Sequence, residues 1–351
     1  MGGRLEADEQ TLLGLARGGD ESAFGDLVER YRTELHAHCY RMLGSVHDAE
    51  DALQDALLRA WKGLPGFEGR GSVRSWMYTI ATNAALDVAR RRPRRESLAG
   101  ISPADGPATP DGPDWLEPYP DHAFGGRLAS SPAARYEQRE SLELAFVVAL
   151  QHLPPLQRAV LILRDVVGFS AREAAEALVT SVPAVTSALQ RARATAQSRL
   201  PARSQQVALR SLGDDRIRLL AERYADAMER GDADLLVSML ASDVTYTMPP
   251  PPTCLRGHVA VREFIHQDVA PLSWQHRATR ANGQLAIGGY ILDPGCGRYL
   301  AAAIDVLTLD GDRITAIDAF LTAEHLRQYG YDGRFTTADF ARFGLPADLP
   351  G

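Results

Sequence analysis

The stretch Phe169–Ala194, FSAREAAEALVTSVPAVTSALQRARA, decides how this chain folds and acts. Ser170, followed three positions later by Glu173, is the signature of a helix-opening capping box, and a short amphipathic segment comes next. Ser181 and Pro183 then predict the start of a second helix after a short turn. Two short helices joined in this way, the second rich in arginine, are typical of a helix-turn-helix whose second helix enters the DNA major groove.

The second helix of this pair has an apolar face, formed by Val185, Leu189 and Ala192, and a polar face. The polar face carries hydroxyl, amide and guanidinium groups, which read base edges or neutralise phosphates. An ordinary helical hairpin is the alternative, but a solvated helix face usually mixes acids with bases. We therefore predict DNA contacts from Pro183, Thr186, Ser187, Gln190, Arg191 and Arg193.

A second arginine-rich segment lies earlier in a chain that is acidic overall, with a formal net charge of −7. Residues 70–95 carry seven Arg against one Asp. Stacking, hydrogen-bonding and phosphate-neutralising groups occur together here, as an unstacked single strand requires. The competing interpretation is that Trp76 simply packs into the core. The residues that we predict for this contact are Phe67, Arg70, Arg74, Trp76, Asn83, Arg90, Arg91 and Arg92.

Composition and periodicity divide the 351 residues into a helical part, a linker rich in Pro and Gly, a second helical part, an α+β domain and a tail. The α+β part shows period-two alternation, with Asp310-Gly311-Asp312 as a hairpin turn. Trp115, Leu116 and Tyr119 are too apolar for a pure spacer, so we expect them to dock onto a folded part. The predicted boundaries are 9–95, 96–136, 137–203, 214–330 and 331–351.

Bulk properties exclude several classes of protein. No apolar run approaches the roughly 18 residues of a membrane span, and no signal-peptide pattern is visible, so we expect a cytoplasmic protein without membrane contact. Cys39, Cys254 and Cys296 lack C-x-x-C spacing, which argues against a disulfide framework. His36 and His38 would point to different faces of one helix, so no metal site is predicted. No cofactor is expected.

Three segments together resemble a bacterial RNA polymerase sigma factor of the extracytoplasmic-function group. DAEDALQDALLRAW (48–61) and SWMYTIATNAALDVARRR (75–92) are similar to region 2, and residues 153–193 are similar to region 4. The resemblance implies a dissociable, non-catalytic subunit that directs core polymerase to promoters and initiates transcription. It assigns the segment after Phe67 to the −10 element and the helix after Pro183 to the −35 element. It also implies contacts with the polymerase β flap, and with the β′ clamp through Asp51, Gln54 and Asp55.

The last third, about 215–330, resembles the cone-shaped fold shared by nuclear-transport-factor-like proteins, SnoaL-like polyketide cyclases and ketosteroid isomerase. The resemblance rests on RYA (223–225), LASDVT (240–245) and VREF (261–264). It places Tyr224 at the position of the isomerase's oxyanion-hole tyrosine, and Met248 where the isomerase keeps its general base. Without that carboxylate we expect regulation of sigma activity rather than catalysis, with a small ligand as a further partner. The predicted pocket residues are Tyr224, Tyr246, Met248, Trp274 and Tyr299, with His276 and Asp305 as further candidates.

The predicted fold is therefore multi-domain: two all-α modules, the second a helix-turn-helix, and an α+β cone with a curved sheet and helices. Three other functions stay open from the sequence. A helix-turn-helix regulator fused to a small-molecule-binding or isomerase-like domain would need no polymerase-binding face. An enzyme with a vestigial DNA-binding part would turn over a ketone-like substrate. An RNA-binding protein is disfavoured, because the A-form major groove is too narrow for a recognition helix.

Overall fold

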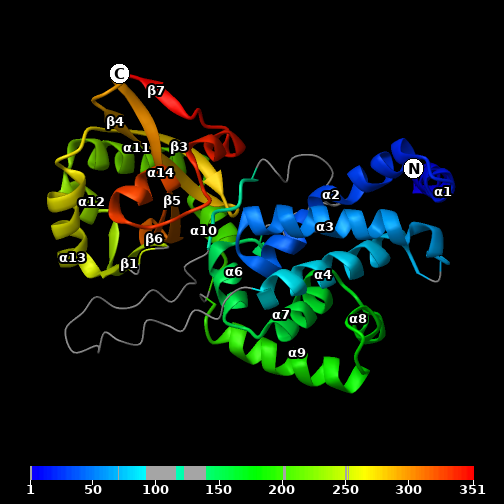
Figure 1. Cartoon of the computed structure of the whole chain (residues 1–351). Helices are drawn as coiled ribbons and strands as arrows, with labels where there is room; N and C mark the ends of the chain where they lie inside the picture. The colour runs from blue at the N-terminus through cyan, green and yellow to red at the C-terminus, as the bar shows by residue number, and fades with distance from the viewer. Residues whose placement is uncertain are drawn as a thin grey trace. The chain divides into compact units, whose positions relative to one another are not determined.

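The computed structural model describes residues 2–69, 71–91, 116–121, 140–200, 203–249, 251 and 253–351. Two compact units are visible in Figure 1. The first contains the described residues up to Arg91 together with Ala149–Arg199, and the second contains 116–121, 140–148 and the chain from Leu200 onward. The predicted site residues Arg70 and Arg92, and the linker residue Trp115, lie outside the described residues.

Four helices build the first part of unit 1, which matches the helical texture predicted for residues 9–92. Asp20 and Ser45 cap two of these helices by accepting hydrogen bonds from the backbone N–H groups of Ala23 and Asp48. Gly44, at a φ of 73°, ends one helix in the left-handed region that suits glycine. The helices are α1 (Gly2–Arg17), α2 (Glu21–Leu43), α3 (Val46–Gly63) and α4 (Val73–Arg91), with the short turn η1 (Leu64–Gly66) between the last two.

The predicted helix-turn-helix is present in the same unit. The Ser170–Glu173 capping box is complete, and Ser181 caps the second helix. Val185, Leu189 and Ala192 are buried, as the sequence predicts. The elements are α7 (Pro155–Leu161), η3 (Ile162–Val166), α8 (Ala171–Ala177) and α9 (Val182–Gln197), and α7 and α8 pack against α4.

Unit 2 is the predicted cone, with a strongly curved sheet in the strand order β2-β1-β6-β5-β4-β3. β1 pairs with β6 in parallel, and the other pairs are antiparallel. Helices cover one face of the sheet (Figure 1), where Tyr224 and Ile265 share a core with Ile287 and Ile317. The strands are β1 (Leu240–Met248), β2 (Thr253–Arg256), β3 (Trp274–Ala281), β4 (Gln284–Asp293), β5 (Arg298–Asp310), β6 (Arg313–Leu321) and β7 (Asp348–Pro350).

The cone is larger than we predicted at both ends. The segment 331–351, predicted as a tail, includes Phe340, which packs beside Gly288 on the other side of β4, and it ends in β7, which pairs with β5. The burial of Phe340 stabilises this segment on the cone, although many of the residues around it are polar. Before residue 214, α10 (Gln205–Leu212) packs against β5. The remaining helices are α6 (Leu144–Gln151), α11 (Asp214–Arg230), α12 (Ala233–Val237), α13 (Gly257–Phe264), η4 (Ile265–Val269), α14 (Ala323–Leu326), η5 (Arg327–Tyr329) and η6 (Thr337–Phe343).

Candidate nucleic-acid interface and cone pocket

The polar face of α9 is exposed along its length. All six residues predicted to contact the −35 element lie on it: Pro183, Thr186, Ser187, Gln190, Arg191 and Arg193. Arg191 Nη1 donates to Ser187 Oγ at 2.6 Å, which aligns a guanidinium and a hydroxyl on neighbouring turns. Such a face offers groups for both base edges and phosphates.

Arg193 has an ionic partner that sequence reasoning missed. Its guanidinium donates to both carboxylate oxygens of Asp165, at 2.8 and 2.7 Å. Asp165 lies in η3, before the helix-turn-helix. The Arg193 side chain is still 52% exposed. Asp165 therefore neutralises part of the positive charge that we predicted for DNA on this face.

The aromatic residues predicted for the −10 element border a hollow in unit 1. Phe67 is 8% exposed and lies 4.9 Å, centroid to centroid, from the Trp76 ring. The hollow measures about 580 Å³, and α8 contributes Glu173 and Glu176 to its lining. The same helix also lines the hollow with Arg172, which lies 3.7 Å from Glu176, so two acids and one base of α8 border the aromatic pair.

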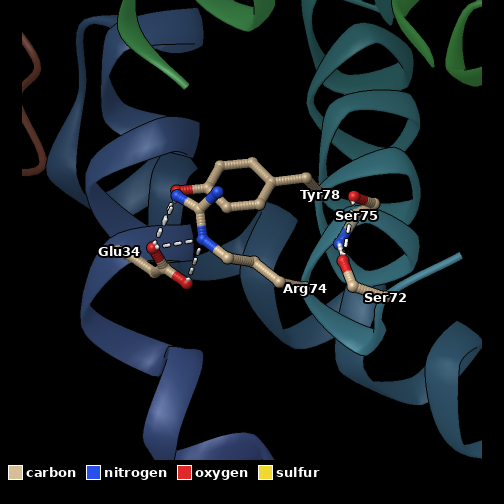
Figure 2. Close-up of polar contacts among 5 residues, drawn as sticks. All are labelled: Glu34, Ser72, Arg74, Ser75 and Tyr78. Carbon is tan, nitrogen blue, oxygen red and sulfur yellow. Dashed lines mark hydrogen bonds and ion pairs between the residues drawn. The ribbon is translucent and has the colours of Figure 1, made fainter. Parts of the chain in front are cut away.

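Arg74, which we predicted to contact the −10 element, binds groups of the protein in this structure. Its guanidinium binds Glu34 of α2 at 3.0–3.2 Å and lies 4.7 Å from the centre of the Tyr78 ring (Figure 2). Burial, and then the charge of Glu34, raises the pKa of Tyr78. Ser72 and Ser75 form a separate pair at the start of α4. In this structure Arg74 joins α4 to α2.

Further along α4, Asn83 contacts another helix, whereas the C-terminal end of α4 is exposed. Asn83, predicted to hold a flipped base, donates weakly to the backbone carbonyl of Ala177 in α8 at 3.4 Å. Arg90 and Arg91 are exposed, as a phosphate contact requires. Arg90 also lies 3.3 Å from Asp87 on its own helix.

The predicted polymerase-binding face of α3 contains a hydrophobic residue that we did not predict. Asp51 and Gln54 are exposed, and Asp55 binds Arg59 at 2.5 Å. Leu58 lies one turn further along and is 60% exposed. Single exposed leucines are common on protein surfaces, so Leu58 adds an apolar group to this face without marking a partner site by itself.

The cone encloses a cavity of about 470 Å³ beside the inner face of its sheet. Tyr246, Met248 and Trp274 line it, as predicted. Tyr224 is fully buried and does not line the cavity, contrary to our prediction, but it donates to the lining residue Asp305, at Oδ2, at 2.8 Å. Tyr299 does not line it, which corrects our prediction: its hydroxyl lies 3.0 Å from Ser273 Oγ instead.

Part of the interdomain linker is bound to the cone. Asn282, fully buried at the β3–β4 turn, accepts a hydrogen bond from Tyr119 N at 2.8 Å through its side chain. Its own N–H donates to Tyr119 O at 2.8 Å, and its side-chain amide donates to Leu142 O at 2.9 Å. One asparagine thus contacts the linker at Tyr119 and the segment 140–148 at Leu142, and Tyr119 docks onto a folded part as the sequence suggested.

Neighbouring residues extend this linker contact. Gly283 N donates to the Asp121 carboxylate at 2.7 Å, and Leu144 N donates to Gln284 Oε1 at 2.8 Å. Glu143 accepts from Gln206 N at 2.9 Å. Residues 140–148, at the start of the segment that we assigned to the helix-turn-helix module, therefore contact the cone in this structure. Among the described residues, no helix is long and apolar enough to span a bilayer.

Comparisons with known proteins agree with these modules. Residues 27–95 match the Sigma-70 region 2 family, residues 143–195 match Sigma-70 region 4, and residues 221–317 match the SnoaL-like domain. The chain is 38% identical to the ECF RNA polymerase sigma factor SigG of Mycobacterium tuberculosis, over 99% of this chain and 88% of that protein. It is 31% identical to SigJ of the same organism, over 82% of this chain and 88% of SigJ.

A solved structure supports the fold. The crystal structure of M. tuberculosis SigJ superposes with a TM-score of 0.55 at 24% identity, covering 86% of this chain and 98% of that chain. The fold of helical modules followed by an α+β cone is thus shared with that protein. The match to SigG extends over nearly the whole chain, so this protein belongs to the extracytoplasmic-function RNA polymerase sigma factors, subunits that join core polymerase and initiate transcription at specific promoters.

Proposed function

We propose that this sigma factor reads the −35 element with α9, opens the −10 element with α4 and the loop before it, and binds the β′ clamp through α3. The observation that carries the proposal is the α9 face, where every predicted reading residue is exposed. The polymerase contact is supported by Asp51, Gln54 and the exposed Leu58 on one side of α3. A second contact, with the β flap, rests on the resemblance to region 4.

We further propose that unit 1 is in a closed state. Asn83 is bonded to Ala177, and Glu173 and Glu176 border the hollow beside Phe67. Arg172 pairs with Glu176 there, so α8 presents an excess of one carboxylate, which would oppose the phosphates of an incoming strand. Region 4 would have to move away from α4 before the −10 strand could bind.

The cone would control that separation by holding the linker. Asn282 and Gly283 hold the linker at Tyr119 and Asp121, and Asn282 also holds Leu142 beyond it. A tethered pair of DNA-binding modules engages two promoter elements only if the linker can span the distance between them. Docked segments shorten the free linker, so we propose that release from the β3–β4 turn favours the open, promoter-binding form.

We propose that the cone binds a small ligand and does not carry out the isomerase reaction. Met248 occupies the position where the resemblance places the isomerase's base, and as an apolar group in the cavity it cannot accept a proton from a substrate.

In vitro transcription with purified core polymerase tests both parts of the proposal. Asn282→Gly removes the side-chain amide but keeps the positive φ of 55° that this turn needs. We expect severalfold more promoter-specific RNA and faster proteolysis of the linker. Asp312→Gly, in the β5–β6 turn, is the matched control. If Asn282→Gly leaves RNA output and proteolysis unchanged, linker control is wrong.

The polymerase-binding face has its own test. Leu58→Asp should reduce binding to core polymerase at least tenfold, whereas Leu15→Asp, at an exposed leucine of α1, should not. Equal binding by both variants would reject the α3 assignment. If the wild-type chain with core polymerase starts no promoter-specific RNA, the assignments of α9 and α4 fail as well.

A further inference from the structure

The cone pocket combines an apolar wall with one deeply placed carboxylate. Its volume of about 470 Å³ falls within the roughly 300–1,000 Å³ of small-molecule sites. Met228, Leu255 and Phe264 are among the wall residues, and Asp305 on β5 is only 4% exposed. A ligand that fills the cavity must be largely apolar and must present its polar group to Asp305.

The charge state of Asp305 restricts that polar group. Burial raises the pKa of its carboxyl to about 6, although the hydrogen bond from Tyr224 and the charge of His276 oppose the shift. Above pH 7 the carboxyl is therefore mostly ionised and can only accept hydrogen bonds. A carbonyl oxygen or an anion would face a group that offers it no proton.

The cavity supplies little positive charge of its own. Among the described residues that line it there is no Arg or Lys, and Glu263 and Asp268 add two further acids. Burial lowers the pKa of His325, which keeps that imidazole neutral. A buried carboxylate without a full countercharge is costly, so a cation that enters the cavity relieves that cost.

Aromatic side chains in the lining suit a cationic ligand. His276 is 4% exposed and also lines the cavity, with its Nδ1 3.7 Å from the Glu229 carboxylate. Aromatic rings of Tyr246, Trp274 and Tyr329 border the same space. Such rings attract organic cations through their π faces.

We propose that the cone pocket binds an apolar amine, with the ammonium group on Asp305 and the hydrocarbon body against the aromatic and aliphatic wall. This inference deepens the ligand-binding role proposed for the cone and requires neither polymerase nor DNA. It assigns Asp305 as the residue that selects the ligand's charge. Tyr224 positions the carboxylate through its 2.8 Å hydrogen bond.

Three probes with the same bicyclic body test the proposal on the full chain at pH 8: 2-(aminomethyl)naphthalene, 2-naphthylmethanol and 2-naphthoate. By isothermal titration calorimetry we expect the amine to bind at least tenfold more tightly than the acid, with the alcohol between them. Lowering the pH to 5 should weaken amine binding about tenfold, because Asp305 is then protonated. Tyr224, Tyr246 and His276 also face Asp305, so Asp305→Asn must remove most of this pH effect.

A matched carboxyl provides the control. Asp318 also has a pKa raised by burial to about 6 and accepts from Thr247, but it does not line the cavity. Asp305→Asn should abolish the preference for the amine, and Asp318→Asn should preserve it. The proposal is overturned if the acid or the alcohol binds as tightly as the amine, if Asp305→Asn binds the amine normally, or if no probe binds at millimolar concentration. The comparison of the three probes on the wild-type chain tests the proposal even if a variant fails to fold. Its outcome does not bear on the sigma activity, which the transcription assays test separately.

Discussion

The two DNA-facing modules of unit 1 differ in how many of their polar side chains already bind protein groups. On α9 the reading face is exposed, and only Arg193 is held by an acid from another element. On α4, Arg74 is bound to Glu34 and Asn83 is bonded to Ala177. If α9 and α4 contact the promoter as we propose, the residues of α9 are exposed for DNA, whereas Arg74 and Asn83 of α4 must first leave their protein partners.

The largest effect should come from removing the exposed arginines of α9. Arg191→Ala combined with Arg193→Ala should lower affinity for duplex promoter DNA at least tenfold, because each arginine contributes about 1–3 kcal/mol if it reads a base. The slope of log K against log salt should fall by about one unit per lost phosphate contact. Fluorescence anisotropy over a salt series measures both. Arg32→Ala, at an exposed arginine of α2, is the control and should change neither.

Asn83→Ala should give a smaller effect of a different kind. We expect promoter opening to slow about fivefold while binding to closed duplex stays unchanged, because the side chain acts on an unstacked base. Permanganate footprinting and binding to pre-melted templates separate the two steps. A variant that opens promoters normally would remove Asn83 from the −10 site and weaken the contrast between the modules.

Asp165→Asn sharpens the comparison from the other side. Freeing Arg193 from its ion pair should raise duplex affinity about two- to threefold and increase the salt slope by up to one unit. The pair is half exposed, so a larger gain is not expected. Unchanged affinity in the same anisotropy assay would mean that Arg193 does not reach a phosphate.

Glu34→Gln tests the Arg74 contact through protein stability. Losing the carboxylate that binds Arg74 should cost about 1 kcal/mol of unfolding free energy, a modest value because the Arg74 side chain is 40% exposed. Urea denaturation followed by circular dichroism measures this change. Glu29→Gln, in an exposed pair with Arg32, should cost less. Equal costs would show that Arg74 does not stabilise the α2–α4 contact.

Local signals in the sequence were sufficient for the helix-turn-helix. The Ser170 capping box and the Ser181 cap act within one turn of the chain, so their spacing alone predicts them. The Arg74–Glu34 pair joins residues 40 positions apart, and no local pattern indicates it. Phe340 is likewise buried by strands far away in sequence, which is why its segment looked like a tail. The positions of such residues depend on packing between segments that are distant in the sequence.

One missed element did carry a local signal. Asn282-Gly283 has positive φ at both residues, as a two-residue hairpin turn requires, and Asn-Gly is the favoured sequence for that turn. It joins β3 to β4, neither of whose full extents we predicted. What the sequence could not indicate is that this turn would be fully buried under linker residues.

Because the turn is buried under these residues, few amino acids can replace Asn282. Asp-Gly and Gly-Gly form the same hairpin equally well in an ordinary solvent-exposed loop, yet neither offers an amide that can donate to Leu142 O while accepting from Tyr119 N. If the cone were fused to another sigma factor, we expect it to fold. Asn282 would nevertheless find no partner unless the segments that contain Tyr119 and Leu142 were transferred with the cone.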